Sequence, residues 1–177
     1  MLNPSTGAAA GDAAMNSAVA DAEHVRHLQH TFDLAQRAVD SGLGGPFGAL
    51  VVLDGEVIAE GWNQVTSSHD PTAHAEITAI RAACARLGTF QLTGAILYAS
   101  CEPCPMCLGA AYWARPAAVY FAASREDAAA ADFSDAMIYD EIGLPPTDRT
   151  LPFRRVEVPG ATDVFRRWLD KADRTDY

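Results

Sequence analysis

Long hydrophobic runs and basic residues are both scarce in this sequence. No apolar segment approaches the ~20 residues that a membrane-spanning helix needs, and residues 1–22 lack the basic segment and the unbroken apolar stretch of a secretory signal. Lys and Arg number 13 against 23 Asp and Glu, which gives a formal net charge of -10. Such a surface repels phosphate backbones and anionic membranes. We therefore expect a cytoplasmic protein that binds no membrane and for which nucleic acid is an unfavourable partner.

Cysteines are also few, and their placement argues against a disulfide scaffold. Three of the four lie within residues 101–107, and such crowding suits metal-bound thiolates in a reducing compartment better than disulfides. The chain has 177 residues, of which 49% are hydrophobic, enough for one domain with a proper core. Residues 1–22, rich in Ala, Gly, Ser and Asp, are predicted to be a flexible N-terminal tail, and residues 23–177 to be the domain.

Apolar periodicity predicts an α/β domain. Asp54-Gly55 between two short apolar runs is a strong signal for a hairpin. After the hairpin, helices and strands alternate, which predicts βαβ crossovers and parallel pairing beside the antiparallel hairpin. The expected helices cover residues 22–40, 73–87, 108–114 and 164–172, and the expected strands cover 49–53, 57–59, 95–99, 117–122 and 152–158.

The segment Cys101–Cys107 lies between a predicted strand and a predicted helix. If Cys104 caps this helix and Pro105 occupies its first turn, Cys104 and Cys107 are three residues apart on one helical face. The partial positive charge of a helix N-terminus favours thiolates over thiols. Two such thiolates provide half of a tetrahedral zinc site.

His74 and Glu76 complete the predicted site from upstream. Roughly thirty residues separate His74 from Cys104, about one helix plus one strand, which brings two helix N-termini together. One imidazole and two thiolates would leave the fourth zinc position open for water, as a catalytic zinc needs. Glu76 is close enough in sequence to act on that water without binding the metal. His-x-Glu followed by Pro-Cys-x-x-Cys is the pattern of zinc deaminases, so we expect one zinc ion per chain.

Other uses of the cysteines fit less well. An iron–sulfur cluster needs a fourth ligand, for which only Cys84 remains. A redox dithiol of Cys104 and Cys107 would leave the histidine and the glutamate without a role. A structural zinc would need Cys101 as its fourth ligand, but Cys101 lies on the strand side of the turn, where support of the site is the expected role.

Beyond the zinc motif, a wider set of segments matches one branch of the deaminases. The matching segments are 44–49, 70–76, 100–109 and 112–116, together with Phe133-x-Asp135, Ile138-Tyr139 and the terminal Tyr177. From about Thr31 onward the chain resembles the bacterial guanine deaminases of the cytidine deaminase-like superfamily. The resemblance implies a three-layer α-β-α fold with a mixed five-stranded sheet. It also implies a homodimer in which the C-terminal segments are exchanged between subunits.

The resemblance further implies the roles of individual residues. His74, Cys104 and Cys107 would hold the zinc ion, and Glu76 would transfer protons. Substrate contacts would come from Asn63 as a base-orienting group, Phe47 as a stacking residue, Asp135 as a carboxylate facing the purine, Ala75 and Trp113 beside the substrate, and Tyr177 closing the pocket from the partner subunit.

Ordinary structural roles stay open for several of these residues. Asparagine favours turns, so Asn63 could be a turn residue. Phenylalanine is usually buried, so Phe47 could be core. Asp135 could cap a helix, and Trp113 could be core rather than pocket wall.

The predicted reaction is the hydrolysis of guanine, a small-molecule purine, to xanthine and ammonia. Zinc would activate the water, and Glu76 would act as acid and base in turn. A deaminase of guanosine or of a related aminopurine or triazine is the nearest alternative. A tRNA adenosine deaminase shares the metal motif, but the acidic composition disfavours a polyanionic substrate. A non-catalytic metal-binding module is the alternative from a different functional class.

Overall fold

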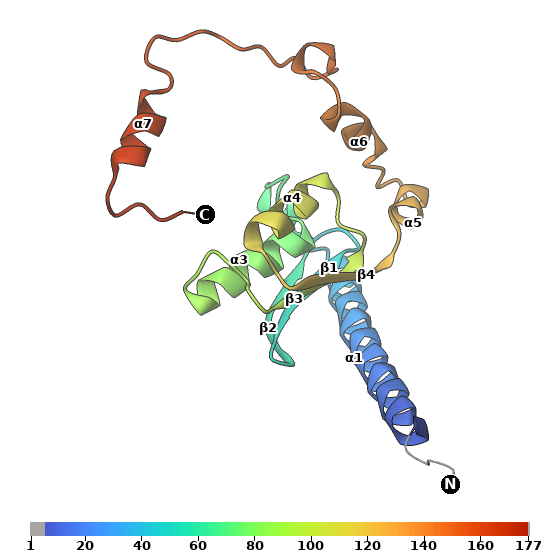
Figure 1. Cartoon of the computed structure of the whole chain (residues 1–177). Helices are drawn as coiled ribbons and strands as arrows, with labels where there is room; N and C mark the ends of the chain where they lie inside the picture. The colour runs from blue at the N-terminus through green and yellow to red at the C-terminus, as the bar shows by residue number, and fades with distance from the viewer. Residues whose placement is uncertain (1–5, 177) are drawn as a thin grey trace. The chain divides into compact units, whose positions relative to one another are not determined.

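The computed structural model describes residues 6–176, with side chains from residue 21 onward (Figure 1). The chain divides into two compact units, Met1–Ser134 and Asp135–Tyr177. The first unit contains all strands of the described chain, and the second contains short helices joined by coil.

The first unit is built on a four-stranded mixed sheet. In hydrogen-bonded order its strands are β2 (Glu56–Trp62), β1 (Gly48–Leu53), β3 (Ile96–Cys101) and β4 (Ala118–Ala123). β1 is antiparallel to both β2 and β3, whereas β3 and β4 are parallel. The connection between β3 and β4 runs through a helix, as the alternation of strands and helices predicts.

The hairpin between β1 and β2 turns at Asp54 and Gly55, as predicted. Their φ angles are 52° and 79°, and a type I′ turn requires positive φ at both central residues. The backbone twist of this turn matches that of the flanking strands, so two residues are enough to reverse the chain.

Helix α1 (Thr6–Asp40) covers one face of the sheet. Its Leu34 packs in a buried cluster with Leu50 and Val52 of β1 and Tyr98 of β3. Side chains of a strand alternate between its two faces, so these residues mark the α1 side of β1.

Helices α3 (Ala75–Leu87) and α4 (Pro105–Ala114) cover the opposite face. Ala79 of α3 and Ala111 of α4 pack in a second cluster with Val51 of β1. Because β1 is covered on both sides, it is apolar throughout rather than alternating. The three-layer α-β-α arrangement is therefore confirmed.

The predicted number of strands is wrong for the described residues. The sheet has four strands rather than five, because the segment 152–158 is coil. A strand exists only through hydrogen bonds to a neighbouring strand, and this segment has no such partner among the described residues. The apolar composition of this segment indicated a strand, but composition alone does not show whether a neighbouring strand is present to pair with it.

Helix α1 begins earlier than the helix predicted over 22–40. It starts at Thr6 and so includes most of the segment for which we predict a flexible tail. The flexibility of residues 1–22 stays a prediction. Two short helices complete the first unit, α2 (Val65–Ser68) and α5 (Arg125–Ala130).

The second unit contains α6 (Ala136–Ile142), the 3-10 helix η1 (Pro146–Asp148) and α7 (Asp163–Asp170). α7 confirms the closing helix predicted over 164–172. Large apolar side chains remain exposed throughout this unit, among them Met137, Ile142, Leu151, Val156, Val158, Val164, Phe165 and Leu169. In the described part of the chain, no helix combines the length and apolar character that crossing a membrane requires.

Candidate active site

Two helix N-termini carry the predicted zinc ligands. His74 is the N-cap of α3 and Cys104 is the N-cap of α4, with Pro105 at the first helical position as predicted. Neither N-cap side chain forms a capping hydrogen bond with its own helix. The imidazole and the thiol are therefore available to contact each other and to bind a ligand.

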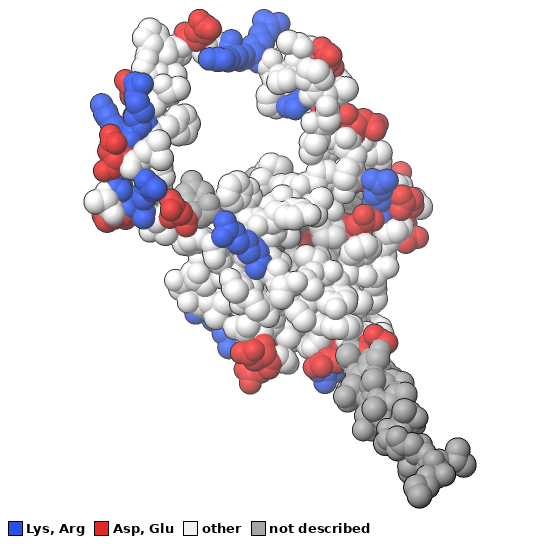
Figure 2. Space-filling model, viewed as in Figure 1, with Lys and Arg blue, Asp and Glu red and all other residues white. Residues whose placement is uncertain are grey.

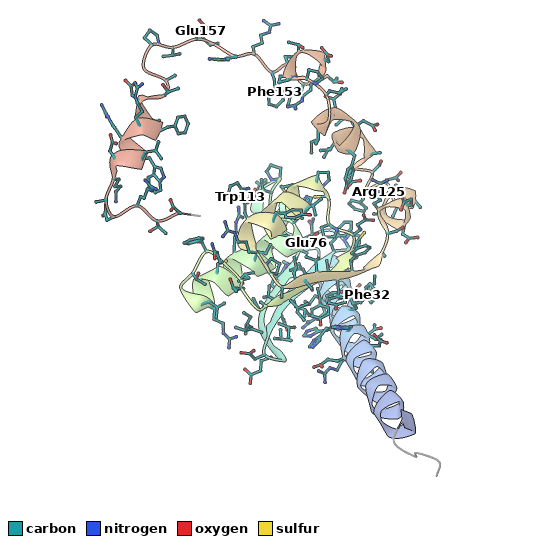
Figure 3. The ribbon with its side chains drawn as sticks, in the orientation of Figure 1. Phe32, Glu76, Trp113, Arg125, Phe153 and Glu157 are labelled. Carbon is teal, nitrogen blue, oxygen red and sulfur yellow. The ribbon has the colours of Figure 1, made fainter. Side chains whose placement is uncertain are left out.

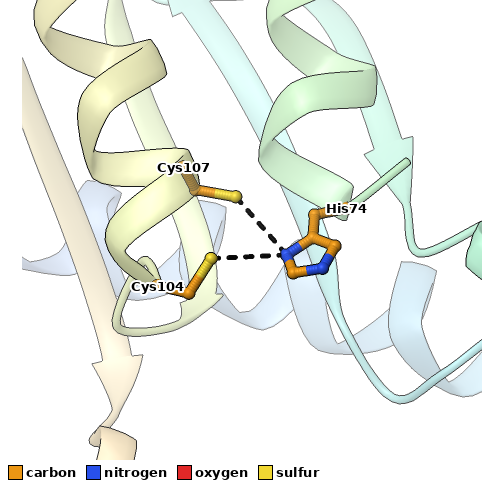
Figure 4. Close-up of side chains that lie close together, drawn as sticks. All are labelled: His74, Cys104 and Cys107. Atoms are coloured by element: carbon orange, nitrogen blue, oxygen red, sulfur yellow. Dashed lines mark hydrogen bonds between the residues drawn. The ribbon is translucent and has the colours of Figure 1, made fainter. Parts of the chain in front are cut away.

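His74, Cys104 and Cys107 lie together as predicted (Figure 4). The His74 Nδ1 atom is 3.5 Å from the Cys104 Sγ atom and 3.6 Å from the Cys107 Sγ atom. In a tetrahedral zinc site with bond lengths of ~2.0 Å to nitrogen and ~2.3 Å to sulfur, these atoms would be about 3.5 Å apart. The donor set of one imidazole and two cysteine sulfurs thus fits zinc in both chemistry and spacing.

The cluster already favours a thiolate. The hydrogen bond from the Cys107 thiol, supported by that from His74, lowers the pKa of Cys104 to about 4. The hydrogen bond to Cys104, together with burial, raises the pKa of Cys107, which keeps its proton beside the Cys104 thiolate. Hydrogen bonding to Cys104 likewise raises the pKa of His74. A divalent cation would replace the protons that the three side chains share.

Glu76 lies inside the first unit, at the second position of α3 (Figure 3). It is 8% exposed. Burial raises the pKa of its carboxyl, and the negative charge of Cys104 adds to the effect. The charges of Cys104 and His74 both act on the Glu76 carboxyl, which is not one of the three donors of the cluster. A buried carboxyl whose pKa is raised holds a proton more readily than an exposed one, which suits a general acid–base.

Asn63 is a turn residue, as the alternative interpretation expects, and it also binds the loop before β1. It follows β2 and is 8% exposed. Its Oδ1 atom accepts hydrogen bonds from the backbone N–H groups of Gly45 and Val65, both at 3.2 Å. The next residue, Gln64, donates its backbone N–H to the carbonyl of Ala73, immediately before His74. Asn63 is thereby tied to the loop that carries the histidine.

Phe47 and Ala75 both pack against the core cluster between the sheet and α3. The ring of Phe47 meets that of Phe133 edge-on, with centroids 5.0 Å apart. The sequence marks Phe133 only through the family resemblance, and nothing in the sequence pairs it with Phe47. Ala75 is a buried member of that cluster.

Trp113, Asp135 and Tyr177 are the remaining predicted site residues. Trp113 is 64% exposed on α4, so the core alternative for this residue is wrong. Asp135 begins the second unit, where its side chain makes no capping hydrogen bond to α6. Tyr177 lies outside the described residues.

Cys101 supports the site rather than joining it. It is buried, and its thiol donates to the carbonyl oxygen of Ser124 at 3.3 Å. Burial raises the pKa of this thiol to about 11. The donor group in the described chain contains three side chains and not Cys101. A four-ligand structural zinc is therefore disfavoured, and a zinc ion held by the three donors would keep one position for water.

Comparison with known proteins matches the chain to deaminases. Residues 21–123 match the family described as the cytidine and deoxycytidylate deaminase zinc-binding region. Guanine deaminase of Bacillus subtilis is 54% identical over 154 residues, which cover 87% of this chain and 99% of that protein. The crystal structure of that guanine deaminase superposes with a TM-score of 0.86.

More distant relatives match less of the chain. A guanine deaminase from Nitrosomonas europaea is 31% identical, covers 69% of this chain and superposes with a TM-score of 0.59. A tRNA-specific adenosine deaminase from Agrobacterium fabrum is 50% identical over 78 residues, which span 51% of its own length. The similarity to the tRNA enzyme is thus limited to part of both chains.

Proposed function

Because the chain belongs to the cytidine and deoxycytidylate deaminase zinc-binding family, we propose that it hydrolyses guanine to xanthine and ammonia. The observation that carries this proposal is the extent of the match. The similarity to Bacillus subtilis guanine deaminase covers 99% of that protein, whereas the match to the tRNA-specific deaminase covers 51% of its length. The formal charge of -10 also disfavours a polyanionic substrate.

His74, Cys104 and Cys107 would hold one zinc ion per chain. Zinc bound there would supply Lewis-acid activation of a water molecule. The Cys104 thiolate and the His74 imidazole meet at the ends of two helices whose backbones are fixed by the core, so the donor atoms need no large movement to bind.

Glu76 would move the protons of the reaction. Its buried carboxyl would take the proton of the attacking water, pass it to a ring nitrogen of guanine and later protonate the departing amine. Burial favours this cycle, since it raises the pKa of the carboxyl and so makes its protonated form easier to reach.

The purine would be held between polar groups at two edges. Asn63 would face one edge as a hydrogen-bond donor. Asp135 would accept hydrogen bonds from the exocyclic amine and the adjacent N–H, because both groups are donors and a carboxylate is an acceptor. Phe47 would stack on the ring, with Ala75 and Trp113 beside it.

We further propose a homodimer with exchanged C-terminal segments, in which Tyr177 of the partner subunit closes the pocket. The exposed apolar residues of the second unit support this assembly, because a monomer rarely leaves so much apolar surface in water. α4 supports it as well: it contains no charged residue, Tyr112 is 78% exposed, and the surface over it is largely uncharged (Figure 2). Four free cysteines agree with a cytoplasmic location.

The deciding experiment measures ammonia release from guanine, guanosine, cytosine and a tRNA substrate by zinc-loaded protein. We expect guanine to be the preferred substrate by a wide margin in kcat/KM. A preference for guanosine, or for another aminopurine or triazine, would keep the chemistry but replace the substrate. Turnover of tRNA alone, with salt-dependent binding, would overturn the proposal.

A further inference from the structure

The side-chain oxygen of Asn63 is fully used within the protein. A carbonyl oxygen has two lone pairs, and Oδ1 accepts from the Gly45 and Val65 N–H groups. Two N–H donors on one atom also identify that atom as the oxygen of the amide and not its nitrogen. The amide is therefore fixed in one of its two orientations.

The two donors depend on Asn63 in turn. Val65 is the first residue of α2, and the N–H at a first helical position has no partner inside the helix. Gly45 lies in the loop before β1. The backbone of Asn63 is tied to the same loop, because its N–H donates to the Phe47 carbonyl at 3.0 Å.

Gly44 makes this close approach possible. A β-carbon at position 44 would lie 1.7 Å from the Asn63 carbonyl oxygen and 2.6 Å from its carbonyl carbon. The obstacle is backbone rather than a flexible side chain, so any other residue at position 44 would displace Asn63 or the loop.

The amide nitrogen of Asn63 is what remains for a ligand. No hydrogen bond from Nδ2 to a described residue is present, although the side chain is largely buried. The group facing a ligand can therefore donate but not accept. Asn63 precedes Gln64, and the Gln64 backbone N–H donates to the carbonyl of Ala73, the residue before His74.

We infer that Gly44, Gly45 and Val65 are positioning residues that hold Asn63 as a donor-only group and so select a base whose facing edge carries acceptors. This inference rests on the proposed deamination of guanine. The O6 and N7 atoms of guanine form such an acceptor edge, whereas a 6-amino purine presents a donor at the first of these positions. A donor-only amide would leave that amino group unpaired or in repulsion with Nδ2.

The first test changes the donor to an acceptor. Asn63→Asp keeps the shape and leaves one oxygen for the two N–H donors, so its second oxygen faces the base. We expect kcat/KM for guanine to fall about 100-fold or more. The ratio of kcat/KM between guanine and 2,6-diaminopurine should fall at least about tenfold, since the new oxygen repels O6 and accepts from the 6-amino group. An unchanged ratio would overturn the inference.

The second test moves Asn63 indirectly. Gly44→Ala should raise KM for guanine about tenfold, change kcat less and lower the same substrate ratio, while zinc content stays at wild-type level. The matched control is Gly48→Ala, whose β-carbon would lie 2.1 Å from the Thr31 carbonyl on the α1 side of the sheet. This control should lower the thermal midpoint but leave the substrate ratio unchanged. If both variants change the ratio alike, the role of Gly44 is only structural and the inference fails.

A measurement on the wild-type protein covers the case in which a variant does not fold. The amides of Gly45 and Val65 should exchange slowly with solvent, because their N–H groups are bound to Asn63. Rapid exchange at both amides would overturn the inference. A wild-type enzyme that releases no ammonia from guanine would instead overturn the proposed function itself.

Discussion

Glu76 is the residue on which we expect turnover to depend most. Its carboxyl is buried beside Cys107, yet it is not one of the three atoms arranged to hold zinc. Metal binding and proton transfer are thus assigned to different side chains. This separation allows one function to be removed while the other is kept.

The substitution Glu76→Gln removes the transferable proton but keeps the size and most of the polarity of the side chain. We expect a full complement of zinc and a fall in kcat of about 10³-fold, the usual scale for loss of a general acid–base. Zinc content by atomic absorption and ammonia release from guanine would measure the two effects. Near-wild-type turnover with zinc bound would remove Glu76 from the mechanism.

His27 is a buried ionisable residue that has no role in the proposed reaction. It lies on α1, is 4% exposed and packs against Tyr98 with ring centroids 4.9 Å apart. Its Nε2 atom has no hydrogen-bond partner among the residues whose side chains are described, although a Glu23 carboxylate oxygen is 3.8 Å away. Burial lowers the pKa of His27, and the nearby charge of Arg26 lowers it further.

A lowered pKa in the folded state gives stability a definite pH dependence. Above the unfolded-state pKa of ~6.5 the imidazole is neutral in both states, and the packing of α1 is at full strength. As the pH falls below that value, the unfolded chain takes up the proton first and the free energy of unfolding decreases.

We therefore expect His27→Leu to reduce the loss of thermal stability between about pH 7 and pH 5. The matched control is His69→Gln, an exposed histidine of the first unit, which should leave the slope unchanged. Thermal midpoints across this range would measure both. Identical slopes for the wild type and His27→Leu would contradict the assignment of the pH dependence to His27.

At the scale of elements, Gly61 sets how closely β2 approaches α3. A β-carbon there would lie 2.3 Å from the Ala75 carbonyl oxygen and 2.6 Å from the Ala79 nitrogen. Both atoms belong to the backbone of α3, whose N-cap is the zinc ligand His74. Side-chain rearrangement cannot relieve such a clash, so the helix itself has to move.

The substitution Gly61→Ala should destabilise the fold by roughly 3 kcal/mol or more and weaken zinc binding by displacing His74. The control is Gly109→Ala, where the added β-carbon would meet open space within 4 Å, so this variant should be neutral or stabilising by up to about 1 kcal/mol. Denaturant unfolding and competition with a zinc chelator would measure the two effects. Tight zinc binding by a destabilised Gly61→Ala variant would mean that His74 is held independently of α3.

At the scale of the whole molecule, the proposed exchange of C-terminal segments makes a prediction about mixed dimers. A chain lacking Tyr177 would have an intact zinc site but an incomplete lid, and a Glu76→Gln chain would have the opposite defect. We expect each variant alone to have little activity while keeping zinc and the dimeric state.

A co-refolded mixture of the two variants should recover about a quarter of wild-type activity. In a symmetric dimer, half of the random pairs are mixed, and each mixed pair has one complete site of two. Ammonia release and light scattering on the mixture would test this. No recovery in a mixture that contains mixed dimers would show that Tyr177 does not act across the interface.

The chemistry of the site was predictable from sequence because each step is local. A proline after Cys104 fixes a helix start, three residues separate the two thiols on one turn, and His74 ends a loop before another helix. The hairpin at Asp54 was equally local, since it depends on the positive φ of two neighbouring residues. The family resemblance added the positions that no local pattern marks, such as Asn63.

Long-range pairings were decided only by the tertiary structure. The sequence by itself predicted the α/β class, the cluster of His74, Cys104 and Cys107, and Glu76 as the proposed proton-transferring carboxyl, because these follow from residue types at characteristic spacings. The folded chain alone decided that segment 152–158 has no strand partner in the described residues, that Phe133 meets Phe47, and that Gly45 and Val65 share the oxygen of Asn63. The contacts of Phe133 with Phe47 and of Gly45 with Asn63 join segments distant in sequence, whereas that of Val65 is local. A backbone N–H group is present at nearly every position, so the sequence does not indicate which acceptor it will bind.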